Sequence, residues 1–591
     1  MDPKKLFSEL KRRKVYGVAI SYGITAWVLA QIAGLVTSSF EAPPWVMKMI
    51  IIALIIGLPI AVILAWVYDM TPQGIIKTKP EALENNQTQK SKKSIIWSLF
   101  LSAIIIISFV TIGSWWALNI YKSTDAKATK SLAILPLRDF TQDDSRDYLA
   151  DGLHSNLITQ VSKISSLRTI PPRSTLQYKN SEKAISEIAK ELGVDVIMET
   201  DIMKFGDTVQ LNIKLIQAFP KERTIWGHLF EKPMSDIYAL YNDVSQQIAK
   251  ELGISLTEQE KSVLSTARKV DPEAYLAYIK GVSSWSKATR KDIDQSLKYF
   301  QLAMQIDPEY AAAYAGVGLV WIGRMQHGFY PGIEIIPKLD SLMSKALELD
   351  NSLSEVHYSI ALYNTWVKWD WERAGVAFKR TIELNPNYAD VRAFYSHYLY
   401  IIGKPDQALE QINKALELDP VSPLIQAIYG MALNFSRNFE EVIELLNKTL
   451  RNTPNDPIAL GALRSAYHNN KEFDKAYEIF IRSYEVINDA EAVLFLRKGY
   501  ANGGYPGALN SLAKLLIDRS SSATTYVTPW RIGTLYTRAG NNDLAINYLY
   551  AAYNEHDSNM PYINIDPIFD DLKNYPEFRN LIAKMNFPNS D

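Results

Sequence analysis

The sequence predicts a multidomain protein with N-terminal transmembrane helices, a small α/β domain and a long all-α solenoid. Three observations lead to this fold class. The C-terminal half repeats a two-helix pattern at a spacing of 34 residues, which is typical of stacked helical hairpins. The middle of the chain mixes short apolar runs with amphipathic segments. Long apolar stretches lie within residues 15–121.

Composition narrows the class of partner. The chain has 591 residues, a formal net charge of −1, a pI of about 6.7 and no cysteine. Because no global positive charge favours nucleic acid, we expect no nucleic-acid partner. The lack of cysteine excludes disulfides, a thiol nucleophile and zinc sites with cysteine ligands.

Three apolar stretches are each long enough to cross a bilayer as a helix. They cover residues 15–37, 46–68 and 95–121. The first stretch is the weakest, and a re-entrant or interfacial helix is the alternative for it. Its polar interruptions are Ser21, Tyr22, Thr25 and Gln31.

Charge predicts the orientation of these stretches. Six basic residues lie in the N-terminal residues 1–14, none lies between the first and second stretches, and five lie in the loop 69–94. Since positively charged loops stay in the cytoplasm, residues 1–14 and 69–94 are expected inside, and everything after residue 121 outside. The lipid bilayer is then one expected partner.

Residues 131–256 read as a compact α/β domain. The run SLAILPL at 131–137 suits a buried strand, and VQLNIKLI at 209–216 alternates as a strand with one polar face does. An amphipathic helix is expected to stop at Gly193, and another to close the domain over 237–252.

These segments carry a family resemblance. SLAILPLRDFTQDDSRDYLADGLHSNLI, LRTIPPRST, ELGVDVIMETDI and DTVQLNIKLIQA together resemble the TolB amino-terminal-type domain of bacterial membrane-linked proteins. FSELKRRKVYGVAISYGITAWVLAQIA, with the later DMTPQGI, resembles a membrane module that precedes such domains. In related proteins a winged-helix DNA-binding domain or a nucleotide cyclase domain sits on the cytoplasmic side. Only about 14 residues precede the first stretch here, so the resemblance implies a stand-alone sensor or scaffold subunit. It would sit as a multi-pass protein in the bacterial inner membrane, with a periplasmic C-terminal region.

From Asp271 onward the sequence resembles tetratricopeptide (TPR) repeats. Successive units close at Asn385-Pro386, Asp419-Pro420 and Thr453-Pro454. Ala408 and Ala415, twelve and five positions before Pro420, let paired helices approach closely. We expect about eight helix pairs over 271–556 and a capping segment over 557–591.

Eight side chains are expected to line the groove of this solenoid, because the repeat register places them on the same surface of consecutive first helices. They are Tyr363, Trp366, His397, Tyr400, Met431, Asn434, Ser465 and His468. Aromatic side chains are favoured binding anchors, which predicts a protein or peptide ligand. The alternative is that these rings pack between repeats or are covered by the C-terminal segment.

No motif for catalysis, metal or cofactor is found. The seven histidines are scattered, and none forms a ligand pair such as HExxH. An acidic cluster around Asp143 lacks the spacing and glycine of a calcium loop. Gly316-Val317-Gly318 lies inside an expected helix without a preceding strand, so we interpret it as packing.

The sequence therefore favours a membrane-anchored interaction scaffold or sensor subunit that binds protein or peptide partners. The alternative is a signal-transduction receptor that works with a separate cyclase or DNA-binding output protein. An enzyme in the α/β domain is a third possibility, which no nucleophile–base pair supports. The sequence does not decide whether the chain forms a homo-oligomer, and it identifies neither the ligand nor the pathway.

Overall fold

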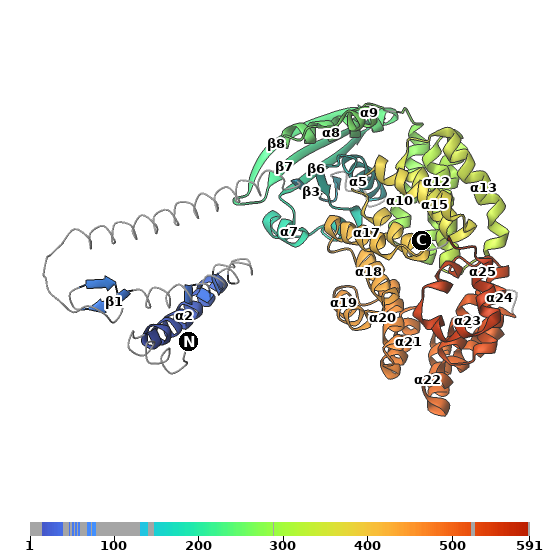
Figure 1. The fold of residues 1–591 in the computed structure, drawn as a ribbon. Helices are drawn as coiled ribbons and strands as arrows, with labels where there is room; N and C mark the ends of the chain where they lie inside the picture. The colour runs from blue at the N-terminus through green and yellow to red at the C-terminus, as the bar shows by residue number, and fades with distance from the viewer. Residues whose placement is uncertain are drawn as a thin grey trace, which may run out of the picture. The chain divides into compact units, whose positions relative to one another are not determined.

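The computed structural model describes residues 15–39, 68–71, 74–77, 130–139, 147–266, 268–287, 289–521 and 526–588, with isolated positions between 47 and 58. The chain forms two compact units, Met1–Ala128 and Thr129–Asp591 (Figure 1). Each unit is described by itself.

The first unit contains helix α2, Val15–Ser39, and a short antiparallel hairpin of strands β1, Tyr68–Thr71, and β2, Gly74–Lys77. The Tyr22 hydroxyl donates a hydrogen bond of 2.8 Å to the Leu54 carbonyl. The hairpin lies at the start of the loop that the sequence placed in the cytoplasm.

The prediction of N-terminal transmembrane helices is wrong. Within the described residues, no helix has both the length and the apolar character that crossing a bilayer needs. Helix α2 coincides with the first predicted stretch, where Ser21, Thr25 and Gln31 interrupt the apolar sequence. Most of the second stretch, 46–68, and all of the third, 95–121, lie outside the described residues. The predicted multi-pass inner-membrane location, with a periplasmic C-terminal region, depended on these helices and is contradicted as well.

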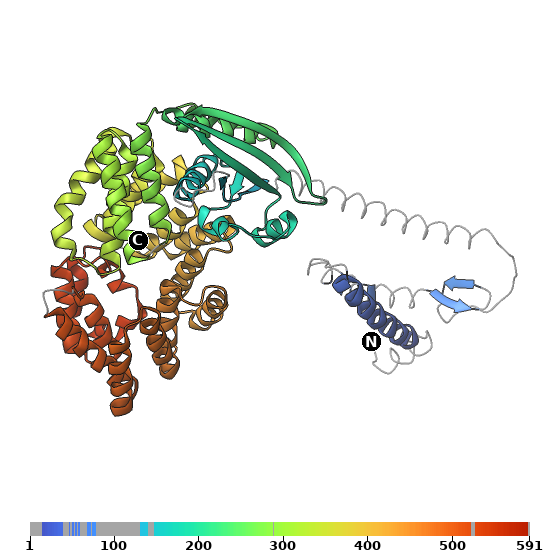
Figure 2. The same cartoon turned by 180° about the vertical axis from the view of Figure 1, so that it is seen from behind.

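The second unit begins with an α/β region built on a mixed sheet. Its strands are β3 Lys130–Ile134, β4 Arg138–Asp139, β5 Leu167–Thr169, β6 Val196–Phe205, β7 Thr208–Gln217 and β8 Arg223–Pro233. The order is β5-β3-β6-β7-β8, with β4 beside β6. Strand β3 runs parallel to both neighbours, whereas β6, β7 and β8 form an antiparallel meander (Figure 2).

Helices cover both faces of this sheet. They are α5 Asp147–Val161, α6 Pro172–Leu176, α7 Ile185–Leu192, α8 Ile237–Glu251 and α9 Glu258–Ser265. The alternation in β7 points Leu211 and Ile213 to the main core, where α5 and α8 pack. On the other face, Ile197 of β6 packs against Ile188 and Leu192 of α7.

A helical solenoid of the tetratricopeptide type follows. Its helices are α10 Pro272–Lys287, α11 Arg290–Ile306, α12 Ala311–Gln326, α13 Gly332–Leu349, α14 Ser354–Tyr363, α15 Trp371–Leu384, α16 Ala389–Ile401, α17 Pro405–Leu418, α18 Pro423–Phe435, α19 Phe439–Asn452, α20 Pro457–Asn469, α21 Phe473–Val486, α22 Ala490–Ser520, α23 Pro529–Arg538 and α24 Asn542–Asn554. A π-helical turn, η3 Asn364–Lys368, extends α14. Helix α22 breaks at Gly503 and Gly504, where Gly504 adopts the left-handed φ of 60°, so its halves form a hairpin of their own.

Small residues let the paired helices touch. Ala408 and Ala415 of α17 are fully buried. A Cβ added at Gly430 of α18 would lie only 3.0 Å from Leu446 of α19. The chain ends in two short 3₁₀ segments, η4 Met560–Asn564 and η5 Pro567–Asn574, and helix α25 Pro576–Lys584.

The α/β region docks on the turns that close two successive repeats. The Asn387 side-chain amide lies 2.7–3.1 Å from the carbonyls of Ser162, Ile164 and Leu167. Asn385 donates to the Ser162 hydroxyl at 2.9 Å. These amides thus bind backbone carbonyls and a hydroxyl of the segment that joins α5 to β5.

One repeat later, Asp419 holds the same interface. The Ser174 hydroxyl lies 2.7 and 2.9 Å from its two carboxylate oxygens, and Asp419 is 1% exposed. Burial raises the pKa of Asp419 to about 6, against the hydrogen bond from Ser174 and the charge of Arg168, which both lower it. Asp419 and Asn385 are 34 residues apart, so the repeat period sets the spacing of the docking contacts.

Replacing Ala408 with tryptophan should destabilise the array. The new side chain would have to fit where the helices touch, and overpacking typically costs about 1–3 kcal/mol or more. We expect a lower midpoint of urea unfolding for Ala408→Trp, followed by circular dichroism. Asn413→Trp, at an exposed position of the same helix, is the control. Equal midpoints for the two variants would contradict the assigned packing.

Asp419 should make stability depend on pH. Because its folded pKa is raised from 3.8 to about 6, the folded state binds the proton more tightly. The contribution is therefore fully present below about pH 4 and is lost as the pH rises through 6. We expect Asp419→Asn to be more stable than the unsubstituted chain at pH 7, by roughly 1–3 kcal/mol, with the difference shrinking toward pH 4. Urea unfolding across this range measures it, and a constant difference would rule out the titration.

Candidate functional site: the inner face of the array

The predicted groove residues do follow one another on consecutive first helices. Tyr363 and Trp366 lie at the end of α14 and in η3, and the other pairs lie on α16, α18 and α20. Five of the eight are buried, namely Tyr363, Trp366, His397, Tyr400 and Asn434. Met431, Ser465 and His468 are half-buried.

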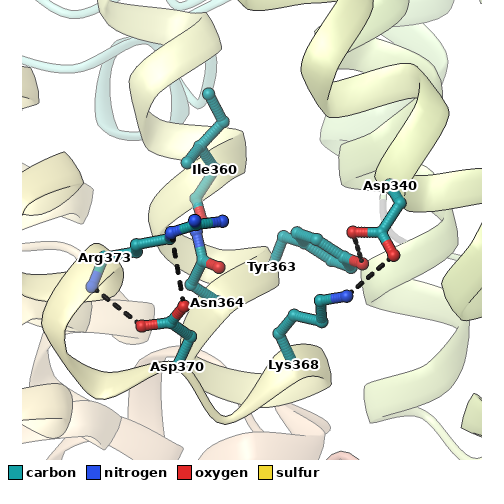
Figure 3. Close-up of polar contacts among 7 residues, drawn as sticks. All are labelled: Asp340, Ile360, Tyr363, Asn364, Lys368, Asp370 and Arg373. Carbon is teal, nitrogen blue, oxygen red and sulfur yellow. Dashed lines mark hydrogen bonds and ion pairs between the residues drawn. The ribbon is translucent and has the colours of Figure 1, made fainter.

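A π-helical turn positions the first pair, and polar contacts hold this turn in place (Figure 3). The Tyr363 hydroxyl donates to Asp340 of α13 at 2.8 Å, and the Lys368 ammonium pairs with the same carboxylate at 2.8 Å. Burial alone would raise the pKa of Asp340, but these two partners outweigh it and lower the pKa. Asp370 then caps α15 by accepting from the Arg373 backbone N–H at 3.1 Å.

Trp366 is fully buried and contacts the C-terminal segment of the same chain. Its indole N–H donates to the Tyr562 hydroxyl of η4 at 3.0 Å. The ring also meets Phe394 of α16 edge-on, with centroids 5.7 Å apart. The inner face at this point is therefore occupied by residues nearly 200 positions away in the sequence.

His397 and Phe435 complete the pocket around Tyr562. The Tyr562 hydroxyl lies 3.3 Å from Nδ1 of His397, and the Tyr562 ring stacks on Phe435 at a centroid distance of 5.9 Å. Burial lowers the pKa of His397 to about 4, so the imidazole is neutral at physiological pH. Tyr400 closes this side by pairing with the Ser436 hydroxyl at 3.0 Å.

The last pair faces a different part of the array. Ser465 accepts a hydrogen bond of 2.9 Å from Arg538 of α23, and Nδ1 of His468 lies 3.2 Å from the Tyr505 hydroxyl of α22. Burial, together with nearby Arg538, lowers the pKa of His468 to about 3. Trp366 and His397 thus face the C-terminal segment, whereas Ser465 and His468 face the last two hairpins, so these predicted residues do not surround one open channel.

The C-terminal segment runs back through the interior of the array. Its fully buried apolar side chains are Met560, Ile563, Phe569, Leu572, Phe578 and Leu581. Arg437 pairs with Asp570 at 2.6 Å, and the Trp371 indole donates to the Met585 carbonyl at 3.2 Å. Residues 557–591 were expected to cap the last hairpin, but they reach α15, α16 and α18 as well.

The array also closes on itself. The Ile333 backbone N–H donates to the Glu555 carbonyl at 3.1 Å, which joins the start of α13 to the end of α24. The Trp369 ring meets His556 edge-on at 3.8 Å. The start of α13 and the turn before α15 therefore contact the last hairpin.

The described residues contain no cluster of three His, Asp or Glu side chains with metal-binding geometry. Tyr562 is the residue at this face that sequence reasoning missed. No periodic pattern marks it, because η4 and η5 do not repeat, and its partners lie in distant helices.

Parts of the chain are similar in sequence to known bacterial proteins. A sequence model described as "HilA/YgeH-like transcriptional regulator, second domain" matches residues 128–226. The chain is 26% identical over 244 residues to "Putative adenylate cyclase 3" of Rhizobium meliloti, covering 41% of each protein. It is 23% identical over 291 residues to the transcriptional regulator HilA of Salmonella typhimurium, covering 48% of this chain and 50% of HilA. The chain thus spans about two fifths to half the length of these curated relatives.

Among solved structures, a thermophilic TPR protein of Thermus thermophilus is 16% identical and aligns with a TM-score of 0.28. The alignment covers 33% of this chain and 98% of that protein.

Tyr562→Phe should destabilise the chain, because it leaves the buried Trp366 N–H without its acceptor. An unsatisfied buried donor costs about 1–3 kcal/mol. The measurement is the free energy of unfolding in urea. Tyr550→Phe is the matched control, since that hydroxyl donates to the Glu577 carbonyl at an exposed position. If both variants unfold at the same urea concentration, Tyr562 does not hold the segment in the array.

Proposed function

We propose that this chain is a non-catalytic interaction scaffold or sensor subunit, whose array holds a protein or peptide partner against its inner face. One observation supports this most strongly. The inner face already holds a peptide-like segment, η4, through aromatic contacts and buried hydrogen bonds to Tyr562. A partner segment would use the same anchors, since buried aromatic side chains dominate recognition of this kind.

A partner would therefore compete with part of the C-terminal segment. Burying one large apolar side chain contributes about 1.5–3 kcal/mol, so displacing all of 557–588 would cost far more than a typical interface returns. The later part, with Phe569, Leu572 and Phe578, belongs to the core of the array. Residues 560–564 bury fewer large side chains, so we propose that a partner replaces η4 alone.

The predicted groove residues take distinct roles in this proposal. Trp366 and His397 would offer their ring nitrogens once Tyr562 leaves, and Tyr400 would flank them. Met431 is only half-buried, so it extends this surface without displacement. Ser465 and His468 face the last two hairpins instead and take no part in this contact.

The ionisable groups at this face support a binding role over a catalytic one. Burial lowers the pKa of His397 to about 4 and that of His468 to about 3. A general base works best with a pKa near the operating pH, which neither imidazole has. Both rings instead contact tyrosine hydroxyls.

A second candidate is a signal-transduction role together with a separate cyclase or DNA-binding output protein. Its support is that the two curated relatives carry names of this kind, an adenylate cyclase and a transcriptional regulator. In this version the partner on the inner face would be that output protein.

Site-specific photo-crosslinking tests the binding face. We expect a photoreactive residue at Met431 to capture the partner in cells, whereas one at Val376, which is 65% exposed on α15, should not. Tyr562→Ala should raise the yield at Met431, because it loosens η4. Circular dichroism of the purified variant controls for loss of helix. Capture at Val376 alone would show that the partner docks on the outer surface, against the proposal.

A further inference from the structure

A cleft lies where the α/β region meets the array, away from the inner face. Its volume is about 370 Å³, within the range of small-molecule sites. One wall comes from α5, α8, α9 and the residues just after α9. The other comes from the turns that close the first two hairpins and from α15. Its polar and charged lining includes Gln160, Lys163, Arg268, Tyr310, Asp350 and Arg380.

The charge of this cleft is predominantly positive. Lys163, Arg268 and Arg380 line it, against a single carboxylate, Asp350. Arg380 pairs with Glu383 at 3.0 Å, and Asp350 accepts from Ser352. The cleft is thus built from opposing elements of two substructures, and within the described residues Lys163 and Arg268 are its two cations without an ion pair.

Lys163 is the least expected residue in this cleft. It is only 8% exposed, and within the described residues its ammonium has no hydrogen bond or ion pair. Burial lowers the pKa of Lys163, while the charges of Glu355 and Asp350 raise it. The side chain of Lys163 is thus largely buried, while the carboxylates that act on its charge lie beyond ion-pair distance, which leaves room for a closer anionic partner.

Gln160, one helical turn before Lys163, gives an independent sign of a missing partner. It is 9% exposed, and its side-chain oxygen is buried without a hydrogen bond among the described residues. Such an acceptor requires a donor, for example a hydroxyl group. The Tyr310 hydroxyl, bonded to Tyr238 at 2.8 Å, adds a neutral polar group, since burial raises the pKa of Tyr310.

We propose that this cleft binds a small oxyanion that carries hydroxyl groups, such as a sugar phosphate or a sugar acid. Lys163 and Arg268 pair with the oxyanion, and Gln160 accepts from a ligand hydroxyl. Because the two walls belong to the α/β region and to the array, the bound ligand strengthens their docking. The proposal is independent of which face binds a protein partner.

Isothermal titration of the full chain with glucose 6-phosphate, gluconate and uncharged glucose tests this proposal. We expect binding of at least one charged probe, at least ten-fold tighter than glucose. The phosphate and the carboxylate probes distinguish the two sources of the oxyanion. Failure of both charged probes to bind would overturn the proposal.

Lys163→Met keeps the length of the side chain and removes its charge, so it should weaken binding at least ten-fold. The variant should melt no lower than the unsubstituted chain, because it removes a buried charge. Lys448→Met, at an exposed position of α19, is the matched control and should bind as the unsubstituted chain does. If Lys163→Met does not fold, Arg268→Gln decides in its place. Unchanged affinity in the cleft variant, or an equal loss in the control, overturns the proposal.

Discussion

The array depends on the burial of its own C-terminal segment. Helical hairpins stacked in a superhelix leave the inner surfaces of their first helices without partners. Here residues 557–588 fill that surface, with Tyr562 between Trp366 and His397, and Phe569 and Phe578 deeper in the core. The array is also closed by a contact between its second and last hairpins, where the Ile333 N–H donates to the Glu555 carbonyl.

The second constraint is the spacing of the repeats. Asn385 and Asp419 stand one period apart, and both bind the α/β region through buried polar contacts. Docking therefore uses the same turns that end each hairpin. Next to these contacts, the surfaces of the α/β region and of the first hairpins do not pack fully against each other. The cleft around Lys163 is the space between them.

Local and periodic features were predictable from the sequence. The 34-residue spacing predicted the paired helices, and the small residues at Ala408 and Ala415 predicted their close contact. The alternation in 209–216 predicted β7 with one buried face. The TPR fold is confirmed, whereas a TolB-like identity for the α/β region stays a prediction.

Features that depend on distant residues were not predictable. Helical spacing placed Trp366 and Tyr400 on one face, but it carries no information on what covers that face. The covering residue Tyr562 lies in a non-repeating segment. The cleft has the same origin, because Gln160 and Arg380 come from distant segments. The transmembrane prediction relied on apolar length in 15–37, 46–68 and 95–121. Within the described residues no helix combines the length and the apolar sequence needed to span a bilayer, and polar residues interrupt the one that coincides with the first stretch.

The central claim is that the C-terminal segment lies inside the array in solution. The chain has no cysteine, so two introduced cysteines can be spin-labelled without background. Asn438→Cys and Asp571→Cys place labels at exposed positions next to the Arg437–Asp570 ion pair. Distance measurement by electron paramagnetic resonance should give a single short and narrow distribution. A broad distribution at long separations would show that the segment is not held in the array, and would contradict the account.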